Sequence, residues 1–329
     1  MSDMSRPNLQ PAKPAAVHAP TPMNKKGAEM FEQPLVLLLV VGGFLAVSTV
    51  IAKAAPAIGW HPLALLQWSV LGGAIGLFAL TRLWGRKGEQ VAKPAAAGDR
   101  KRFAIYLIFS GLLFIAPNMI AVVAASKVGA GFVSLSYAFP LVLTYAIAVI
   151  LRLERFQLLR GTGVLFGLVG GVLLAVSGSK LSVEASWWSI FALSIPVFLA
   201  TGNIYRTLKW PKGATPVDLA LGMMATGFLA LAIFTAAIGI PVVPSGWSPE
   251  AVGLLAAQMA IFALQYGLYF RLQQTAGPVY LSQIGSVAAV IGLGLGFLVF
   301  GEIPNAAKLA AVASVGAGIV LVTLGRVKA

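Results

Sequence analysis

Six amide side chains interrupt the long apolar segments of this sequence, and they have the clearest capacity to bind a ligand. They are Gln67, Asn118, Asn203, Gln258, Gln265 and Gln283. An amide exposed to lipid is costly, so such groups normally face a helix bundle or a cavity. Gln258 and Gln265 are seven residues apart, which places them on one face of a helix. Hydrogen bonding between neighbouring helices is the alternative role for any one of these amides.

Aromatic residues lie close to several of these amides. Tyr137 stands three residues before Pro140, where a proline can kink a helix and free backbone carbonyls. Amides and aromatic rings around one cavity would suit a small zwitterionic or amphipathic organic molecule. We therefore predict a substrate-binding set formed by Gln67, Trp68, Asn118, Tyr137, Asn203, Gln258, Gln265, Tyr266 and Gln283.

The sequence predicts neither an enzyme nor a site for a metal or cofactor. It has no cysteine, and its two histidines, His18 and His61, are far apart. No Asp or Glu stands in the middle of an apolar segment, which weakens a mechanism based on a central proton relay. No Walker sequence is present for direct use of ATP. We expect Glu154 and Glu302, near segment ends, to cap helix corners and pair with basic residues, although a role in coupling stays open.

The elements that must position these residues are membrane-spanning helices. The chain is 58% hydrophobic and only 10% charged, whereas soluble domains carry about 25% charged residues. Its apolar runs are continuous and roughly 20 residues long, which favours helices over a barrel. After a disordered tail over residues 1–33, we expect an all-α polytopic membrane protein with ten transmembrane helices. These cover residues 34–52, 62–81, 103–124, 128–151, 161–177, 186–205, 217–238, 250–270, 277–300 and 306–325.

The distribution of basic residues predicts the orientation of these helices. The chain contains 24 lysines and arginines and has a net charge of +14. With the N-terminus inside, the outer loops hold only Lys53, Lys127, Lys180 and Lys308. This bias follows the positive-inside rule, so the charge is an insertion signal and not a surface for nucleic acid. We expect a multi-pass protein of the cytoplasmic (inner) membrane with both termini in the cytoplasm.

Two stretches of the sequence repeat each other at an offset of 148 residues. This offset aligns Gly129 with Gly277, Ser134 with Ser282, Glu154 with Glu302, Arg160 with Lys308 and Gly170 with Gly318. Ten helices divide into five and five, and an odd number in each half makes the second half enter the membrane upside down. The sequence thus predicts two inverted five-helix repeats, over residues 34–177 and 178–329. Inverted repeats are typical of secondary transporters, with the substrate site at the repeat interface.

These features together resemble the drug/metabolite transporter superfamily, and within it the ten-helix EamA-like proteins. The strongest part is the small-residue turn from Ala124 to Gly131, the following helix with Pro140, and Leu153-Glu154-Arg155. The second half repeats this more loosely, with Ala276-Gly277-Pro278 and Gly301-Glu302. One departure lies at the start of the second helix, where relatives commonly carry Arg-Phe and this chain has Gln67-Trp68. The superfamily handles many substrates, so the resemblance implies a fold and a transport function but no particular substrate.

The expected function is secondary transport of a small organic metabolite by alternating access, with export as the expected direction. The expected partners are therefore that small molecule and the lipid bilayer, without nucleic acid, and a coupling ion or proton and a homodimer both stay open. The alternative function is that of a scaffold, a membrane protein that assists another without transporting anything. Apolar substitutions of Gln265, Asn118 and Tyr137 would leave a scaffold intact and abolish transport by a carrier.

Overall fold

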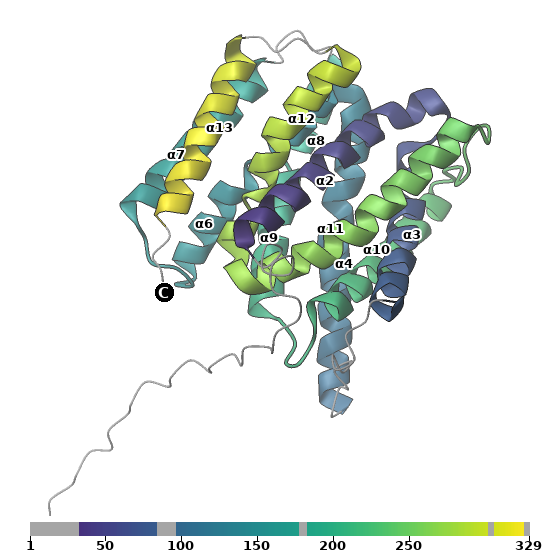
Figure 1. Cartoon of the computed structure of the whole chain (residues 1–329), viewed down its shortest axis with the longest axis horizontal. Helices are drawn as coiled ribbons and strands as arrows, with labels where there is room; N and C mark the ends of the chain where they lie inside the picture. The colour runs from purple at the N-terminus through teal and green to yellow at the C-terminus, as the bar shows by residue number, and fades with distance from the viewer. Residues whose placement is uncertain (1–32, 84–96, 178–182, 302–305, 326–329) are drawn as a thin grey trace, which may run out of the picture.

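The computed structural model describes residues 33–83, 97–177, 183–301 and 306–325, and within these ranges every regular element is a helix (Figure 1). The helices are α2 (Pro34–Ala54), η1 (Ala55–Ile58), α3 (Pro62–Leu83), α4 (Ala97–Val128), α5 (Ala130–Ser136), α6 (Pro140–Ile150), α7 (Leu158–Ser177), α8 (Val183–Ala192), α9 (Ile195–Leu208), α10 (Pro216–Ala237), α11 (Pro249–Leu281), α12 (Ile284–Phe300) and α13 (Ala306–Leu324). All but the last residue of the predicted tail, and also Glu302, lie outside the described residues.

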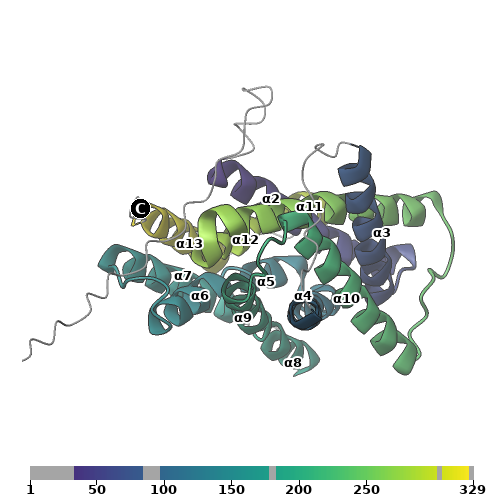
Figure 2. The same cartoon turned by 90° about the horizontal axis from the view of Figure 1, so that it is seen from below.

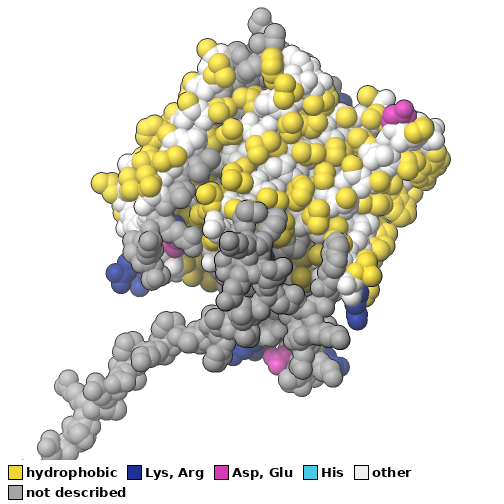
Figure 3. Space-filling model, viewed as in Figure 1, with side chains coloured by type: hydrophobic (Ala, Val, Ile, Leu, Met, Phe, Trp, Pro, Cys, Tyr) yellow, Lys and Arg dark blue, Asp and Glu magenta, His cyan; other side chains and the backbone are white. Residues whose placement is uncertain are grey.

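Six helical segments are long and apolar enough to cross a membrane. They are Pro34–Ile58, Pro62–Leu83, Asp99–Val128, Trp187–Leu208, Pro216–Ala237 and Pro249–Leu281. Four shorter apolar helices accompany them: Pro140–Ile150, Leu158–Gly170, Ile284–Phe300 and Leu309–Val322. Large apolar side chains such as Ile75, Leu298 and Ile233 are exposed. Figure 3 shows hydrophobic side chains spread over the face of the helices that it draws. Lipid contact accounts for this exposure, and the molecule fits a polytopic membrane protein.

Proline and capping residues fix where several helices begin. Thr215 caps α10 by accepting a hydrogen bond from the backbone of Asp218, and the Asp218 carboxylate accepts one back from the backbone of Thr215. Ser248 caps α11 by accepting from the backbone of Ala251. In both helices the residue after the cap is proline, which has no N–H to lose at that position.

Two of the predicted continuous spans are broken helices. The predicted span 128–151 is α5 followed by α6, with the break at residues 137–139, and the predicted span 186–205 is α8 followed by α9. In each case a proline lies four residues beyond the last residue of the first helix: Pro140 after Ser136, and Pro196 after Ala192. Because proline has no N–H for the carbonyl four residues earlier, the helix ends there and a new one starts.

Two predicted loops are instead helical. Residues 125–127 belong to α4, and residues 271–276 belong to α11. The chain turns later, at Gly129 with φ 92° and at Gly277 with φ 78°. Glycine adopts a positive φ at little cost. A glycine just after an apolar helix therefore locates the turn more accurately than the predicted end of the apolar segment.

Helices from the two halves of the sequence are mixed in space. The helices α2 and α3 pack against α11 and α12, while α9 and α10 pack against α4. Figure 2 shows α2, α11, α12 and α13 on one side of the molecule and α4, α6, α7 and α9 on the other. Neither half therefore forms a separate body, and space between the two groups is bordered by both halves.

The two groups come into close contact at the break between α5 and α6. There Gly285 of α12 lies directly against the backbone carbonyl of Tyr137. Further along α12, Gly292 lies against the side chain of Ser134. Each glycine lets α12 come nearer than any other residue would allow.

A second close contact joins α7 and α13. A side chain at Gly318 would meet the Gly163 carbonyl oxygen at 2.7 Å and the Gly167 nitrogen at 3.0 Å. The Ser314 hydroxyl donates a hydrogen bond of 2.7 Å to the Phe166 carbonyl across the same interface. We expect Gly318→Leu to lower the free energy of unfolding by about 2 kcal/mol or more, because the helices must move apart.

Thermal unfolding of the purified protein in detergent would measure this loss. Gly316→Leu is the control, since that glycine lies on the same helix with no atom within 4 Å of the added carbon. Equal loss of stability in both variants would contradict the packing described for α7 and α13.

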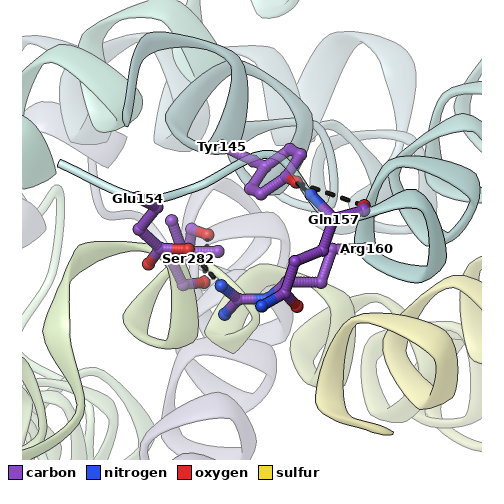
Figure 4. A network of polar contacts seen from close by, with 6 residues as sticks. Tyr145, Glu154, Gln157, Arg160 and Ser282 are labelled. Atoms are coloured by element: carbon purple, nitrogen blue, oxygen red, sulfur yellow. Dashed lines mark hydrogen bonds and ion pairs between the residues drawn. The ribbon is translucent and has the colours of Figure 1, made fainter. Parts of the chain in front are cut away.

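The corner between α6 and α7 is closed by polar contacts (Figure 4). Glu154 forms an ion pair with the buried Arg160 of α7, which confirms the predicted structural role of this glutamate. The Tyr145 hydroxyl accepts a hydrogen bond of 3.0 Å from the backbone of Gln157. The carboxylate of Glu154 allows the guanidinium of Arg160 to be buried.

Candidate functional site

A cavity lies between the two groups of helices, beside the break between α5 and α6. Its volume is about 60 Å³, counted as the space open to the centres of water-sized molecules. One water centre needs about 10–15 Å³, so the cavity holds several waters or part of a small solute. It is lined by Leu45, Phe114, Asn118, Tyr137, Pro140, Leu199, Asn203, Arg206, Met223, Gln265, Tyr266, Tyr269, Leu281, Ser282, Ile284 and Gly285.

The structure brings five of the nine predicted site residues to this cavity. They are Asn118, Tyr137, Asn203, Gln265 and Tyr266. Gln258, seven residues before Gln265 on the same helix, lines a smaller adjoining cavity that shares Leu45, Asn118 and Tyr137 with the first. The amides of both halves of the chain therefore converge, because α4, α9 and α11 meet at this point.

Three predicted site residues lie elsewhere, and their hydrogen bonds or burial explain why. The Thr235 hydroxyl donates a bond of 2.6 Å to the Gln67 side-chain oxygen, which joins α10 to α3. The Trp68 indole donates one of 2.6 Å to the Val242 carbonyl. Gln283 is fully buried between two cavity residues of the chain but is not itself part of the lining. For Gln67 the correct interpretation is the alternative one, a hydrogen bond between helices.

A polar network forms one wall of the cavity. The Asn203 side-chain oxygen accepts bonds from the Tyr269 hydroxyl at 2.6 Å and from Arg206 Nη2 at 3.1 Å. Arg206 Nη2 also donates to the Tyr269 hydroxyl at 2.8 Å. Gln273 Nε2 donates to the Asn203 carbonyl and to the Thr207 hydroxyl, each at 3.0 Å. These bonds hold the end of α9 against α11 and fix the direction of the guanidinium.

Arg206 lines the cavity but is absent from the site predicted from the sequence. It lies in the last turn of α9, and its side chain is only 2% exposed. One signal in the sequence did point to it: Arg206 follows Asn203 by three residues, so both face the same side of a helix. Hydropathy and the distribution of basic residues do not depend on that spacing. By those two criteria a basic residue at the end of a span belongs to the solvated loop.

Aromatic rings form another part of the cavity lining. The rings of Phe114 and Tyr266 meet edge to face with centroids 4.8 Å apart, and Tyr266 also contacts Tyr269 at 6.1 Å. Gln265 is buried here, and its side-chain oxygen has no hydrogen-bond partner among the described residues. A bound molecule would therefore meet an apolar, aromatic surface and an amide oxygen able to accept a hydrogen bond.

The described residues contain no cluster of side chains typical of a metal site. No group of three His, Asp or Glu side chains comes together anywhere within the described ranges. The cavity lining offers hydroxyls, amides and one guanidinium, which suit recognition of an organic solute better than coordination of a metal ion.

Comparisons with known proteins show the fold only. No family model matches the chain, and no curated protein matches it. A solved structure described as "Crystal structure of protein" aligns with a TM-score of 0.64 and 15% sequence identity. The alignment covers 88% of this chain and 98% of that one. The helical arrangement therefore recurs over nearly the whole length of a protein whose crystal structure is known.

Proposed function

We propose that this protein is a secondary transporter that moves a small organic metabolite across a membrane by alternating access. The observation that carries the proposal is the cavity, which is lined by both halves of the chain and lies beside a broken helix. Transporters bind their substrates in such places, since broken helices offer backbone groups and mobile halves there. The resemblance to EamA-like proteins of the drug/metabolite transporter superfamily points to the same function.

Ten transmembrane helices in two inverted repeats are part of this proposal. Six helices are long and apolar enough to cross a membrane, and the four shorter apolar helices are proposed as the remaining crossings. The two turn glycines, Gly129 and Gly277, are aligned by the repeat and share a positive φ. Inversion, together with the bias of basic residues, favours a protein of the cytoplasmic membrane with both termini inside.

Contacts between aligned residues support the inverted repeat further. Two residues exchanged by a twofold axis can touch each other only near that axis. Tyr137 touches Gly285 and Phe166 touches Ser314, and both pairs are aligned at the offset of 148. Reciprocal contacts occur as well. The offset aligns Gly163 with Ala311 and Gly170 with Gly318, and Gly163 contacts Gly318 while Gly170 contacts Ala311.

In this mechanism the cavity opens to one side of the membrane at a time. The contact of Gly285 with the Tyr137 backbone joins the two groups of helices near the proposed axis and would serve as the pivot. The helices on either side, including α9 and α11, would then rock about it and expose the cavity alternately. We propose export as the physiological direction.

Transport assays in proteoliposomes test this proposal. The purified protein, reconstituted into vesicles, is expected to accelerate both uptake and counterflow of at least one solute from a panel of small organic acids, amines and neutral metabolites. A folded, reconstituted protein that moves none of them would count against a carrier and favour the scaffold alternative.

A cavity-filling substitution sharpens the assay. Leu199 lines the cavity on α9, whereas Val197 of the same helix is 54% exposed on the outer surface. We expect Leu199→Trp to reduce the transport rate at least about tenfold, because the larger ring occupies the substrate space. Val197→Trp is the matched control and should leave the rate within about twofold, and similar losses in both would argue against this cavity as the route.

A further inference from the structure

The guanidinium of Arg206 is a buried charge whose hydrogen-bonding capacity is only partly used. Nη2 reaches Asn203 and Tyr269, both neutral groups. Nη1 has only the Met223 sulfur, at 4.0 Å, and Nε has no hydrogen-bond partner among the described residues. An arginine carries five N–H donors, so donors remain for an acceptor that the protein does not supply.

None of the carboxylates whose side chains the structure describes compensates this charge. Glu154 pairs with Arg160, and Asp218 belongs to the cap of α10. Asp99 and Glu250 lie exposed in the first turns of α4 and α11. The C-terminal dipole of α9 and the Tyr269 ring, whose centroid lies 5.5 Å from the guanidinium carbon, stabilise the charge in part. Neither of them is a counter-ion.

Buried charges in proteins are normally paired, because an unpaired one is costly to remove from water. Arg206 instead borders a cavity, together with the buried Asn203 and Gln265. Among the sixteen lining residues it alone is charged. The missing counter-ion is thus expected inside the cavity and not within the protein.

We infer that the transported substrate is a small organic monoanion, a carboxylate with an apolar or aromatic body, whose carboxylate binds to Arg206. A single guanidinium matches one negative charge, and its planar fork fits a carboxylate with two parallel hydrogen bonds. A doubly charged phosphate would keep one charge unpaired here. The rings of Phe114, Tyr266 and Tyr269 contact the body, and the Gln265 oxygen accepts a hydrogen bond from any N–H or O–H group on it.

The inference rests on the proposed transport function, so its test measures binding and not flux. Matched probes are added to the full-length protein in detergent at low salt. Their binding is measured by thermal shift and by equilibrium dialysis. The probes are propionate, benzoate and phenylacetate, the amide of each, phenethylammonium, and inorganic phosphate. We expect at least one carboxylate to bind about tenfold or more tightly than its amide, and phosphate and the ammonium to bind more weakly still.

Substitutions then assign the selectivity to Arg206. Arg206→Gln is expected to weaken carboxylate binding about 10- to 100-fold, since it removes hydrogen bonds to a charged group. Arg206→Lys keeps the charge without the fork and should recover part of the loss. Because the arginine is unpaired in the free protein, Arg206→Gln should also leave the melting temperature of the free protein unchanged or raise it.

Arg160→Gln is the matched control, because Arg160 is also buried but has Glu154 as its partner. It should lower the melting temperature and leave carboxylate binding unchanged. The inference is overturned if no carboxylate binds, if an amide or the ammonium binds as tightly as the carboxylates, or if Arg206→Gln keeps full affinity. Selective carboxylate binding without flux in vesicles would uphold a carboxylate site at Arg206 and refute the transport function. Flux of neutral or cationic solutes alone would uphold the transport function and refute the carboxylate site at Arg206.

Discussion

Replacing Gly285 by alanine is expected to remove about 3 kcal/mol or more from the free energy of unfolding, because the new methyl group would overlap the Tyr137 carbonyl. The obstacle is backbone, so no rotation of a side chain can relieve it. Tyr137 and Gly285 both line the cavity, and the substitution should therefore abolish ligand binding as well as lower stability. Thermal unfolding and gel filtration of the purified variant would measure the first effect.

Gly294→Ala provides the control for this substitution. Gly294 lies on the same helix, is exposed, and has no atom within 4 Å of an added side-chain carbon. Alanine favours a helix over glycine by about 1 kcal/mol, so this variant should be as stable as the natural protein or slightly more so. Tolerance of Gly285→Ala at full stability would mean that α12 and the α5–α6 break are not in contact.

Replacing Asn203 by aspartate is expected to stabilise the free protein and to abolish carboxylate binding. Aspartate has nearly the same shape and still accepts hydrogen bonds from Arg206 and Tyr269, but it also supplies the counter-ion that Arg206 lacks. We expect a gain of about 1–3 kcal/mol in the free energy of unfolding, because the attraction between the new carboxylate and Arg206 exceeds the cost of burying that carboxylate. A bound carboxylate would now face a like charge, and at least about a 100-fold loss of affinity should follow.

Asn118→Asp is the matched control, because Asn118 lines the same cavity on α4 and donates a hydrogen bond to the Phe114 carbonyl of its own helix. A carboxylate there has no arginine beside it in the described network, so it should destabilise the protein. Opposite signs for the two variants, measured as shifts in melting temperature, identify the charge of Arg206 as the cause. Destabilisation by both would show that Arg206 is already compensated.

The candidate site was predictable where the relevant signal is local. Asn118, Asn203 and Gln265 stand out because an amide inside an apolar segment needs a polar partner or a cavity. The same rule selected Gln67, yet its partner is a single threonine hydroxyl on a neighbouring helix. Which of these two solutions a given amide adopts depends on the helix that packs against it, and a sequence pattern does not contain that information.

Arg206 illustrates the same limit from the opposite direction. A basic residue at the end of an apolar run is most often solvated, so its type and position pointed to a loop. Its burial follows from α11, which places Tyr269 against the last turn of α9 and closes water out. In the sequence, only the three-residue spacing from Asn203 indicates that Arg206 faces the same side of the helix as that amide.

The sequence by itself determined the class of structure, because hydrophobicity and length act locally: an apolar run of sufficient length forms a helix that avoids water. It also marked both turn glycines, since a positive φ depends on the residue type at that position. The tertiary structure decided which amides converge, and that a charged side chain enters the cavity without a carboxylate partner. Those features depend on contacts between segments far apart in the chain, and packing across such distances fixes the site and the proposed charge of its ligand.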